Sequence, residues 1–190
     1  MNDSIETITL AGGCFWCVEA VFELVEGVVS VISGYTGGHT ENPSYMEVCS
    51  GTSGHAESIQ VKFDSNIIDY PTVLEIFFAY HDPTTLDRQG PDIGSHYRSE
   101  IFYHTNKQKE IAEIIIKGLE SEEIFPAPIV TKISEMSTFY EAESYHQSFY
   151  KKNGYQPYCQ ILITPKVAKL REMHSELLKP EPHSDHINEF

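Results

Sequence analysis

Residues 5–33 carry the pattern that most constrains the fold, because they read in turn as a strand, a tight turn, a helix and a second strand. Polar and apolar side chains first alternate, as they do on a half-buried strand. Gly12-Gly13 then permits a tight turn, and apolar residues from Val18 to Val25 repeat at helical spacing. An apolar run at residues 28–33 completes the pattern. Such a strand-helix-strand unit predicts an α/β protein.

The rest of the chain continues to alternate strand and helix patterns, with no internal repeat. A long loop at residues 81–99 holds three Asp, two His, Arg88 and Arg98, and loops of that length are uncommon unless they are functional. The other predicted elements are a strand at 56–63, a helix at 71–80, a strand at 100–104, a helix at 106–119, a strand near 129–133, and helices at 141–150 and after Pro165.

Length and charge limit the classes of function. The 190 residues are long enough for one well-buried core, and we expect a single domain over residues 1–179 followed by a flexible acidic tail at 180–190. A formal charge of −15 argues against nucleic acid as a partner. We find neither a membrane span nor a signal peptide, and therefore expect a cytoplasmic protein.

The segment from Gly13 to Glu19 points to thiol chemistry. It places Cys14 at or near a helix N-terminus, where free N–H groups and the helix dipole favour a thiolate. Cys17 follows three residues later, and the chain's only tryptophan, Trp16, stands between the two cysteines. Alternatively Cys14 is a small buried side chain and its aromatic neighbours belong to the core.

Glu57 is the second candidate. It shares one face of a strand with Ile59, Val61 and Phe63, so burial should raise its pKa and leave it able to donate a proton near neutral pH. The alternative is an ion-paired glutamate at the exposed start of that strand.

Several weaker signals surround these two. Tyr45, Tyr97 and Asp92 lie where a phenol or carboxyl could point into a pocket, although with 11 tyrosines any one can be ordinary packing. A zinc site is an alternative use of the cysteines, but no second Cys-x-x-Cys supports it. We expect ion pairs between Arg88 or Arg98 and Asp82, Asp87 or Asp92, and an ordinary surface or core role for His146 in a helix.

Eight short motifs together resemble those of the class A peptide methionine sulfoxide reductases. They occur in the family's order between about residues 7 and 165, and the set is specific even though each member is weak. The motifs are Gly13-Cys14-Phe15-Trp16, Gly34-Tyr35-Thr36-Gly37-Gly38, Pro43-Ser44-Tyr45, Gly54-His55-Ala56-Glu57, His81-Asp82-Pro83-Thr84, Gln89-Gly90-Pro91-Asp92-Ile93-Gly94, Tyr97-Arg98-Ser99 and Tyr145-His146-Gln147.

The resemblance implies a fold and an activity. The fold would be a two-layer α+β sandwich with a ferredoxin-like mixed sheet and flanking helices. The activity would be reduction of the S epimer of methionine sulfoxide, free or in proteins, and so the repair of oxidised proteins, with thioredoxin or another dithiol as reductant. No cofactor or metal would be needed, and we expect a monomer.

The resemblance also implies roles for the candidate residues. Cys14 would attack the sulfoxide sulfur while Phe15 and Trp16 hold the methyl group. Glu57 would protonate the oxygen with help from Tyr45 and Tyr97, and Asp92 would support the site; attack leaves a sulfenic acid on Cys14.

A second thiol must then form a disulfide with Cys14, and both Cys17 and Cys159 are candidates. We favour Cys159, because it follows a loop that we expect to be mobile. The main alternative function is a general thiol–disulfide oxidoreductase that uses Cys14 and Cys17 as its pair.

Overall fold

The computed structural model describes residues 4–180, and it contains the elements predicted at the N-terminal end. They are β1 (Ile5–Gly12), α1 (Phe15–Phe22) and β2 (Val28–Thr36). β1 and β2 run parallel to each other, but they are not neighbours, because β3 (Ala56–Asp64) lies between them and is antiparallel to both. The predicted unit is therefore a split β-α-β unit.

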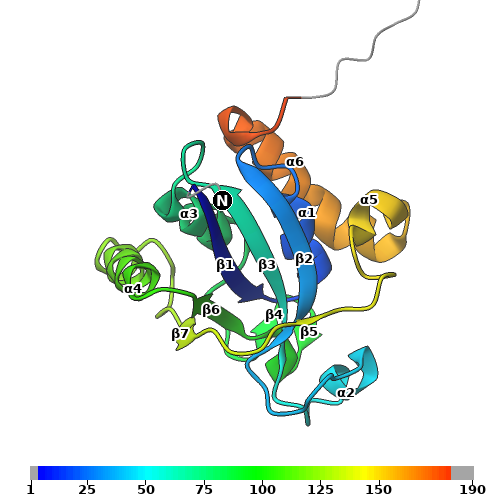
Figure 1. The fold of residues 1–190 in the computed structure, drawn as a ribbon. Helices are drawn as coiled ribbons and strands as arrows, with labels where there is room; N and C mark the ends of the chain where they lie inside the picture. Colours follow the sequence, from blue (N-terminus) through cyan, green and yellow to red (C-terminus); the bar gives the residue numbers. More distant parts are fainter. Residues whose placement is uncertain (1–3, 181–190) are drawn as a thin grey trace, which may run out of the picture.

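Six strands form the main sheet, in the order β7-β6-β1-β3-β2-β8 (Figure 1). With α3 (Tyr70–Tyr80) before β6 (Ser99–Tyr103), the chain follows a β-α-β-β-α-β path whose four strands lie in the order β6-β1-β3-β2. This is the ferredoxin-like arrangement, and β7 (Lys132–Glu135) makes the sheet mixed by pairing in parallel with β6. The predicted fold class is confirmed.

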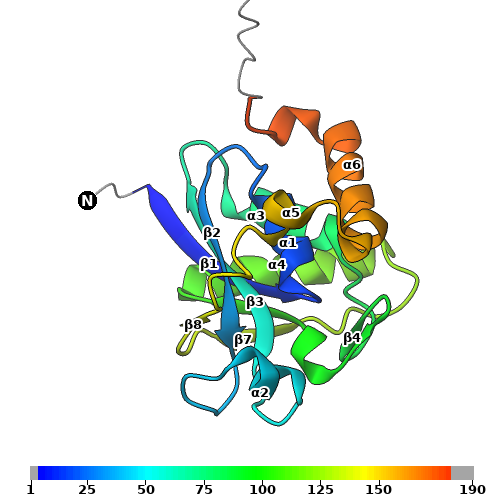
Figure 2. The same ribbon diagram turned by 90° about the vertical axis from the view of Figure 1, so that its right-hand side faces the viewer.

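Helices cover one face of this sheet and form the second layer (Figure 2). α1 and α3 lie there with α5 (Phe149–Asn153) and α6 (Thr164–Met173), and the main apolar core fills the space between them and the strands. The remaining elements are α2 (Tyr45–Cys49), α4 (Asn106–Ser121), β4 (Arg88–Gln89), β5 (Asp92–Ile93), β8 (Tyr140–Glu141), the 3₁₀ turns Ser95–Tyr97 and Ser175–Leu177, and a π-helical turn at Cys159–Ile163.

Local chemistry explains where the predicted helices begin. The Asp69 carboxylate accepts a hydrogen bond from the backbone N–H of Thr72 at 2.9 Å, and Pro71 occupies the first turn of α3. The Thr105 hydroxyl caps α4 in the same way, accepting from the backbone N–H of Gln108 at 3.2 Å. Both caps satisfy N–H groups that the helix itself leaves without partners.

The helix predicted over residues 141–150 is wrong. Glu141 ends β8, turns follow, and α5 begins only at Phe149 after Ser148, whose φ is 50°. Polar side chains replace the helical hydrogen bonds, since Glu19 accepts from the backbone N–H groups of Ser148 and Phe149 at 2.9 and 3.0 Å. The strand predicted near 129–133 also lies a few residues later, at β7.

The loop at residues 81–99 is partly ordered by a hairpin of β4 and β5. The ion pairs predicted within it are wrong. Arg98 pairs instead with Glu100 at 2.6 Å, and Arg88 donates to the carbonyl of Gly90 at 2.8 Å. Over residues 4–180, neither arginine forms an ion pair with Asp82, Asp87 or Asp92.

Apart from Pro180, the tail predicted at residues 180–190 lies outside the described residues. Within residues 4–180, no helix combines the length and apolar character needed to cross a membrane.

Candidate active site

Cys14 lies where the sequence predicts, at the first boundary of α1. It is the N-cap residue of that helix, and the backbone N–H of Cys17 donates to its carbonyl at 3.0 Å. The sulfur is mostly buried, with 7% of the residue exposed, and Cys17 is 5% exposed. Gly13 before it has a φ of +92°, and a Cβ there would meet the Gln89 side chain at 2.4 Å, so a glycine is needed for this approach.

Glu57 faces the start of the same helix. Its carboxylate accepts from the backbone N–H of Phe15 at 3.0 Å, and the residue is 2% exposed. Burial raises its pKa to about 8, although the Phe15 hydrogen bond acts in the opposite direction. Glu57 therefore holds a proton at neutral pH. The strand alternation predicted this burial correctly, and the exposed, ion-paired alternative is wrong.

Tyr45 and Tyr97 bring two phenols towards this carboxyl from α2 and from the 3₁₀ turn Ser95–Tyr97. Burial raises the pKa of each. A hydrogen bond with Cys49 raises the pKa of Tyr45 further, and the charge of Glu57 raises the pKa of both phenols. They therefore keep their protons and can donate hydrogen bonds over the physiological range. Glu57 thus has two proton-bearing phenols within range of its charge, and the charge of Cys14 also raises the pKa of one of them, Tyr97.

The thiolate predicted at Cys14 is not the favoured form in this structure. Burial raises the pKa of Cys14 well above its usual value, and a hydrogen bond with Cys17 and the charge of Glu57 raise it further. The same hydrogen bond lowers the pKa of Cys17. Burial destabilises the Cys14 thiolate more than the helix N-terminus stabilises it. The favourable interaction of one charge with a helix end is small beside the free-energy cost of burying a thiolate.

Asp92 lines the same cavity as the two thiols. It accepts a hydrogen bond from the phenol of Tyr158 at 2.8 Å, and the Tyr158 oxygen lies 4.0 Å from the Cys17 sulfur. A cavity of about 90 Å³ is lined by Cys14, Cys17, Gln89, Gly90, Pro91, Asp92, Leu162 and Lys166. Larger hollows lie elsewhere, including one of about 550 Å³ between α4 and residues 125–129, but that hollow holds no nucleophile. The smaller cavity is therefore the candidate active site because it holds the two thiols, even though larger cavities exist.

Cys159 does not lie in a mobile loop. It begins the π-helical turn Cys159–Ile163 and is fully buried in the main core. The loop interpretation was wrong because Tyr158 and Ile163 pack inward and anchor the turn on both sides. Cys159 still lies near Cys17. Burial raises the pKa of Cys159, and the charge of Cys17 raises it further.

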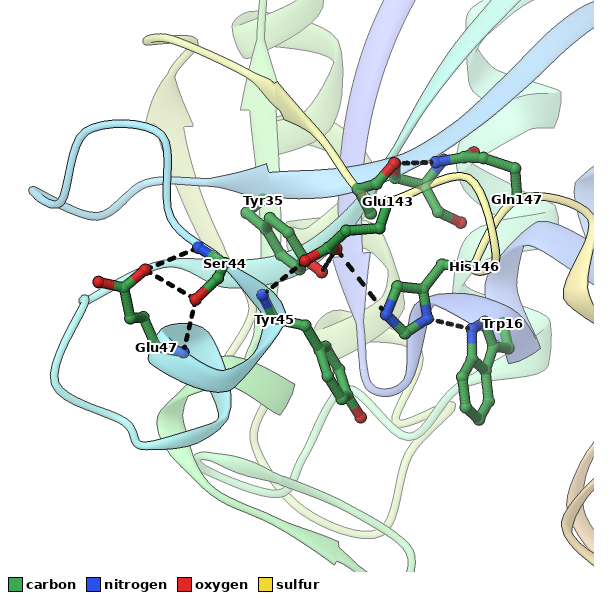
Figure 3. Close-up of polar contacts among 10 residues, drawn as sticks. Trp16, Tyr35, Ser44, Tyr45, Glu47, Glu143, His146 and Gln147 are labelled. Atoms are coloured by element: carbon green, nitrogen blue, oxygen red, sulfur yellow. Dashed lines mark hydrogen bonds and ion pairs between the residues drawn. The ribbon is translucent and has the colours of Figure 1, made fainter.

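Phe15 and Trp16 form an aromatic wall at the start of α1, with ring centroids 6.3 Å apart. The Trp16 ring stacks on Phe149 at 3.7 Å, and its indole N–H donates to Nδ1 of His146 at 3.1 Å (Figure 3). The imidazole is 1% exposed. The ring that the resemblance assigns to substrate binding is therefore fixed by partners from residues 146–149.

Sequence reasoning missed three residues of this site. Tyr158 reaches both Asp92 and the Cys17 sulfur, Glu143 accepts from the phenol of Tyr35 and the backbone of Tyr45, and His146 contacts Trp16. The signal was present in the motif Tyr145-His146-Gln147 and in the residue before Cys159. Neither segment has a strand or helix periodicity that would indicate which way its side chains point. Within residues 4–180, no three His, Cys, Asp or Glu side chains are grouped so as to hold a metal ion.

The fold and the site together define a thiol-based oxidoreductase: two cysteines and a protonated buried carboxyl meet at a helix start, with aromatic rings beside them. The model of the family "Peptide methionine sulfoxide reductase" matches residues 6–178. The chain belongs to this family.

Curated relatives agree. The chain is 51% identical to peptide methionine sulfoxide reductase MsrA of Chromobacterium violaceum over 92% of this chain and 99% of the relative. It is also 51% identical to the MsrA of Saccharolobus solfataricus, over 92% of this chain and 98% of the relative. At this identity over nearly the whole length, the activity is reduction of methionine sulfoxide by a class A enzyme, and the prediction is confirmed.

Solved structures share the fold. Reduced Mxr1 from Saccharomyces cerevisiae superposes with a TM-score of 0.73 at 34% identity, covering 82% of this chain and 90% of that one. Methionine sulfoxide reductase A of Corynebacterium diphtheriae gives 0.71 at 32%, covering 82% and 79%. A further Mxr1 structure, solved in complex with Trx2, shows likeness in fold at 24% identity, with a TM-score of 0.52 and coverage of 78% and 87%.

Proposed function

We propose that Cys14 is the nucleophile, Glu57 the general acid, and Tyr45 and Tyr97 the hydrogen-bond donors in the reduction of the S epimer of methionine sulfoxide. The observation that carries this proposal is the Glu57 carboxyl, 2% exposed, with its pKa raised to about 8 and bonded to the first N–H of the helix that Cys14 caps. A carboxyl in that state can donate a proton to an oxygen next to the Cys14 sulfur.

The reaction transfers one oxygen atom. The Cys14 sulfur attacks the sulfoxide sulfur, and protonation by Glu57 neutralises the negative charge that develops on oxygen. The attack forms an S–S bond between Cys14 and the substrate. This bond and the sulfoxide S–O bond then break as an S–O bond forms at Cys14, and the products are the thioether and a Cys14 sulfenic acid. Phe15 and Trp16 offer apolar ring surface to the substrate methyl group, while Asp92 positions Tyr158 beside the thiols.

A Cys14 that starts as a thiol is compatible with this chemistry. The hydrogen bond between Cys14 and Cys17 raises the pKa of Cys14 and lowers that of Cys17, so Cys14 keeps its proton in the resting site. Cys14 therefore becomes the nucleophile only when it loses that proton during attack on the sulfoxide. Burial then protects it from unrelated oxidants until a sulfoxide enters.

Cys17 is the better candidate to capture the sulfenic acid first. It shares a hydrogen bond with Cys14 and lines the same cavity, so its sulfur lies next to the sulfur that would carry the sulfenic acid. Cys159 is fully buried next to Cys17, so it would enter second, by exchange with Cys17. The condensation releases water, and an external dithiol then reduces the disulfide.

We propose thioredoxin as that dithiol, supported by the family's activity and by the relative that was solved with Trx2. A cytoplasmic location follows as part of the same proposal. It is supported by the cysteine count, since four cysteines in 190 residues do not make the disulfide scaffold of a small secreted protein.

The test uses the two sulfoxide epimers separately with dithiothreitol as reductant. We expect consumption of the S epimer and none of the R epimer, measured by chromatography of the released methionine. Equal use of both epimers, or of neither, would contradict the proposed substrate. A general thiol–disulfide oxidoreductase would instead reduce a model disulfide and leave both sulfoxides unchanged.

A further inference from the structure

Lys166 is a cation at the thiol cavity that the chemistry described so far does not use. It lies in α6, the helix that packs beside α1 (Figures 1 and 2). Its half-buried side chain lines the cavity of about 90 Å³ together with Cys14 and Cys17. Within residues 4–180, Lys166 forms no ion pair with a carboxylate, so its charge is not neutralised in that way.

The stability of α6 does not explain a lysine at this position. Lys166 lies in the first turn of the helix, which contains no acidic residue, and a cation there faces the positive end of the helix dipole. Lys169 on the same helix has local partners, since its Nζ donates to the carbonyl of Ala79 at 3.2 Å and lies 5.3 Å from the centroid of the Tyr80 ring. Among the described residues, Lys166 has no such hydrogen bond or ring contact.

The charge of Lys166 acts on Cys17. The hydrogen bond with Cys14 lowers the pKa of Cys17 most, burial opposes that shift, and the Lys166 charge lowers the pKa further. The Asp92 carboxylate raises it. The titratable groups that face Cys17 come from five parts of the fold: Cys14 at the start of α1, Glu57 on β3, Asp92 on β5, Tyr158 and Cys159 at the π-helical turn, and Lys166 on α6. Lys166 is the cation of this set.

The contribution of Cys14 is lost when Cys14 reacts. Once Cys14 carries a sulfenic acid, its S–H no longer exists to donate to Cys17. Tyr158 has a single O–H, which it donates to Asp92 at 2.8 Å. The Lys166 charge remains whatever the oxidation state of Cys14. It therefore still favours the Cys17 thiolate at the step in which Cys17 has to act as a nucleophile.

We propose that Lys166 is a positioning residue for disulfide formation: its ammonium group at the thiol cavity holds Cys17 as the thiolate that attacks the Cys14 sulfenic acid. The Cys17 sulfur forms an S–S bond with the Cys14 sulfur, and the Cys14 S–O bond breaks. The hydroxyl takes up the proton that Cys17 released and leaves as water. Cys17 is oxidised and Cys14 is reduced, so this step consumes no external reductant. The proposal rests on the proposed function in one respect, namely that Cys17 captures the sulfenic acid first.

The experiment measures how the Cys14 sulfenic acid divides between two fates. The protein receives one equivalent of the S epimer of methionine sulfoxide and a fixed concentration of dimedone, which traps sulfenic acids, and no reductant. Mass spectrometry then gives the ratio of dimedone adduct to Cys14–Cys17 disulfide. This ratio does not depend on whether methionine release or disulfide formation is slower.

Lys166→Met removes the charge and keeps a long apolar side chain. It should release the first methionine like wild type and raise the adduct-to-disulfide ratio at pH 7 by about threefold or more. The effect is smaller than the loss of thiolate alone, because a thiolate of higher pKa is a better nucleophile. The excess over wild type should shrink as pH rises, since alkali ionises Cys17 in the variant as well. An unchanged ratio, or a raised ratio that does not depend on pH, would overturn the proposal.

Two variants separate charge from shape. Lys166→Arg keeps the positive charge and should hold the ratio within about twofold of wild type. Lys169→Met is the matched control, because it removes a lysine of the same helix whose ammonium group is bound at Ala79 and Tyr80, and its ratio should equal that of wild type. An equal rise in Lys169→Met would mean that the net charge of the helix, not Lys166, sets the ratio, and the proposal would fail.

A direct readout uses Cys14→Ser, in which the Cys14 thiol cannot act on Cys17. The rate of Cys17 alkylation by iodoacetamide should have its midpoint at a higher pH when Lys166→Met is added, and the same midpoint in both proteins would refute the role of Lys166. Cys17→Ser tests the order of the thiols separately. If Cys17→Ser forms a Cys14–Cys159 disulfide as efficiently as wild type forms its own, the proposed order fails. If Cys17→Ser yields only adduct while Lys166→Met behaves like wild type, the order stands and the role of Lys166 fails.

Discussion

Residues 5–64 and residues 140–163 build the two sides of the site by different means. The first region places Cys14 and Glu57 with one helix start and one strand, so its reactive groups follow from regular periodicity. The second region supplies Glu143, His146 and Tyr158 from turns and a π-helical turn that individual polar contacts hold in place. Regular elements therefore carry the bond-forming groups, and the irregular segment positions what surrounds them.

The comparison predicts that replacing Cys14 or Glu57 in the first region abolishes or slows the sulfoxide step, whereas substitutions in the second region change binding, recycling or stability. The largest effect should come from Cys14→Ser. A hydroxyl oxygen cannot replace the redox-active sulfur, so methionine release should be undetectable with any reductant. Cys49→Ser, which keeps a hydroxyl beside Tyr45, should retain turnover. Sulfoxide reduction in a clean Cys14→Ser preparation would refute the proposed nucleophile.

Glu57→Gln should slow the sulfoxide step by about 10²-fold or more, because general acids contribute on that order. The amide keeps an oxygen that can accept from Phe15, so the fold should survive. Single-turnover methionine release measures the effect, and Glu135→Gln on the exposed side of β7 is the control. A Glu57→Gln enzyme as fast as wild type would leave Glu57 with a structural role only.

The pH profile tests the same residue independently. The folded pKa of about 8 means that Glu57 is protonated below that pH and loses its proton above it. The single-turnover rate of the wild type should therefore fall as pH rises through about 8, and this alkaline fall should be absent from Glu57→Gln. Cys14 ionisation acts in the opposite direction, so an alkaline rise in the wild type would show that nucleophile formation limits the step instead.

The order of the thiols is the next test. Cys17→Ser should accumulate sulfenic acid after one methionine is released, while Cys159→Ser should still form the Cys14–Cys17 disulfide. Peptide mapping after one equivalent of sulfoxide measures both. A dominant Cys14–Cys159 disulfide in the wild type would reverse the proposed order. Cys17→Ser also separates the functions, because a general oxidoreductase would lose every activity without it.

Sequence alone predicted the first region well for a physical reason. Alternating polar and apolar residues predicted β1 and β3, and this alternation placed Glu57 on the buried face of β3. The glycine turn before an apolar helix pattern placed Cys14 at the start of α1. The split of the β-α-β unit by β3 was not predictable, because strand order depends on pairing between distant segments.

The second region was predicted poorly because periodicity does not control it. Residues 141–148 have a helical pattern, yet Glu19, 129 positions away from Ser148, takes the backbone N–H groups at the start of α5. The buried state of Cys159 likewise depends on the packing of the π-helical turn against α1. Such contacts between distant residues leave no local signal.

The smallest effect should come from Gln147, the side chain that ties the irregular segment to the sheet. Its amide oxygen accepts from the backbone N–H of Ser33 at 2.9 Å, and its NH₂ donates to the carbonyls of Ser33 and Ala142 at 2.8 and 2.9 Å. Ser33 is fully buried, so water cannot replace the lost partner. Gln147→Ala should lower the free energy of unfolding by about 1–3 kcal/mol, as expected for an unsatisfied buried group.

Urea unfolding followed by circular dichroism measures this loss, and Gln160→Ala on the exposed side of the π-helical turn is the control, with a change within about 0.5 kcal/mol. The limiting single-turnover rate of Gln147→Ala should stay near wild type, since Cys14 and Glu57 are held by the first region. If Gln147→Ala lost the chemical step as completely as Cys14→Ser, the two regions would not divide chemistry from positioning as proposed. A stability equal to wild type would show that the turns are held by Glu19 alone.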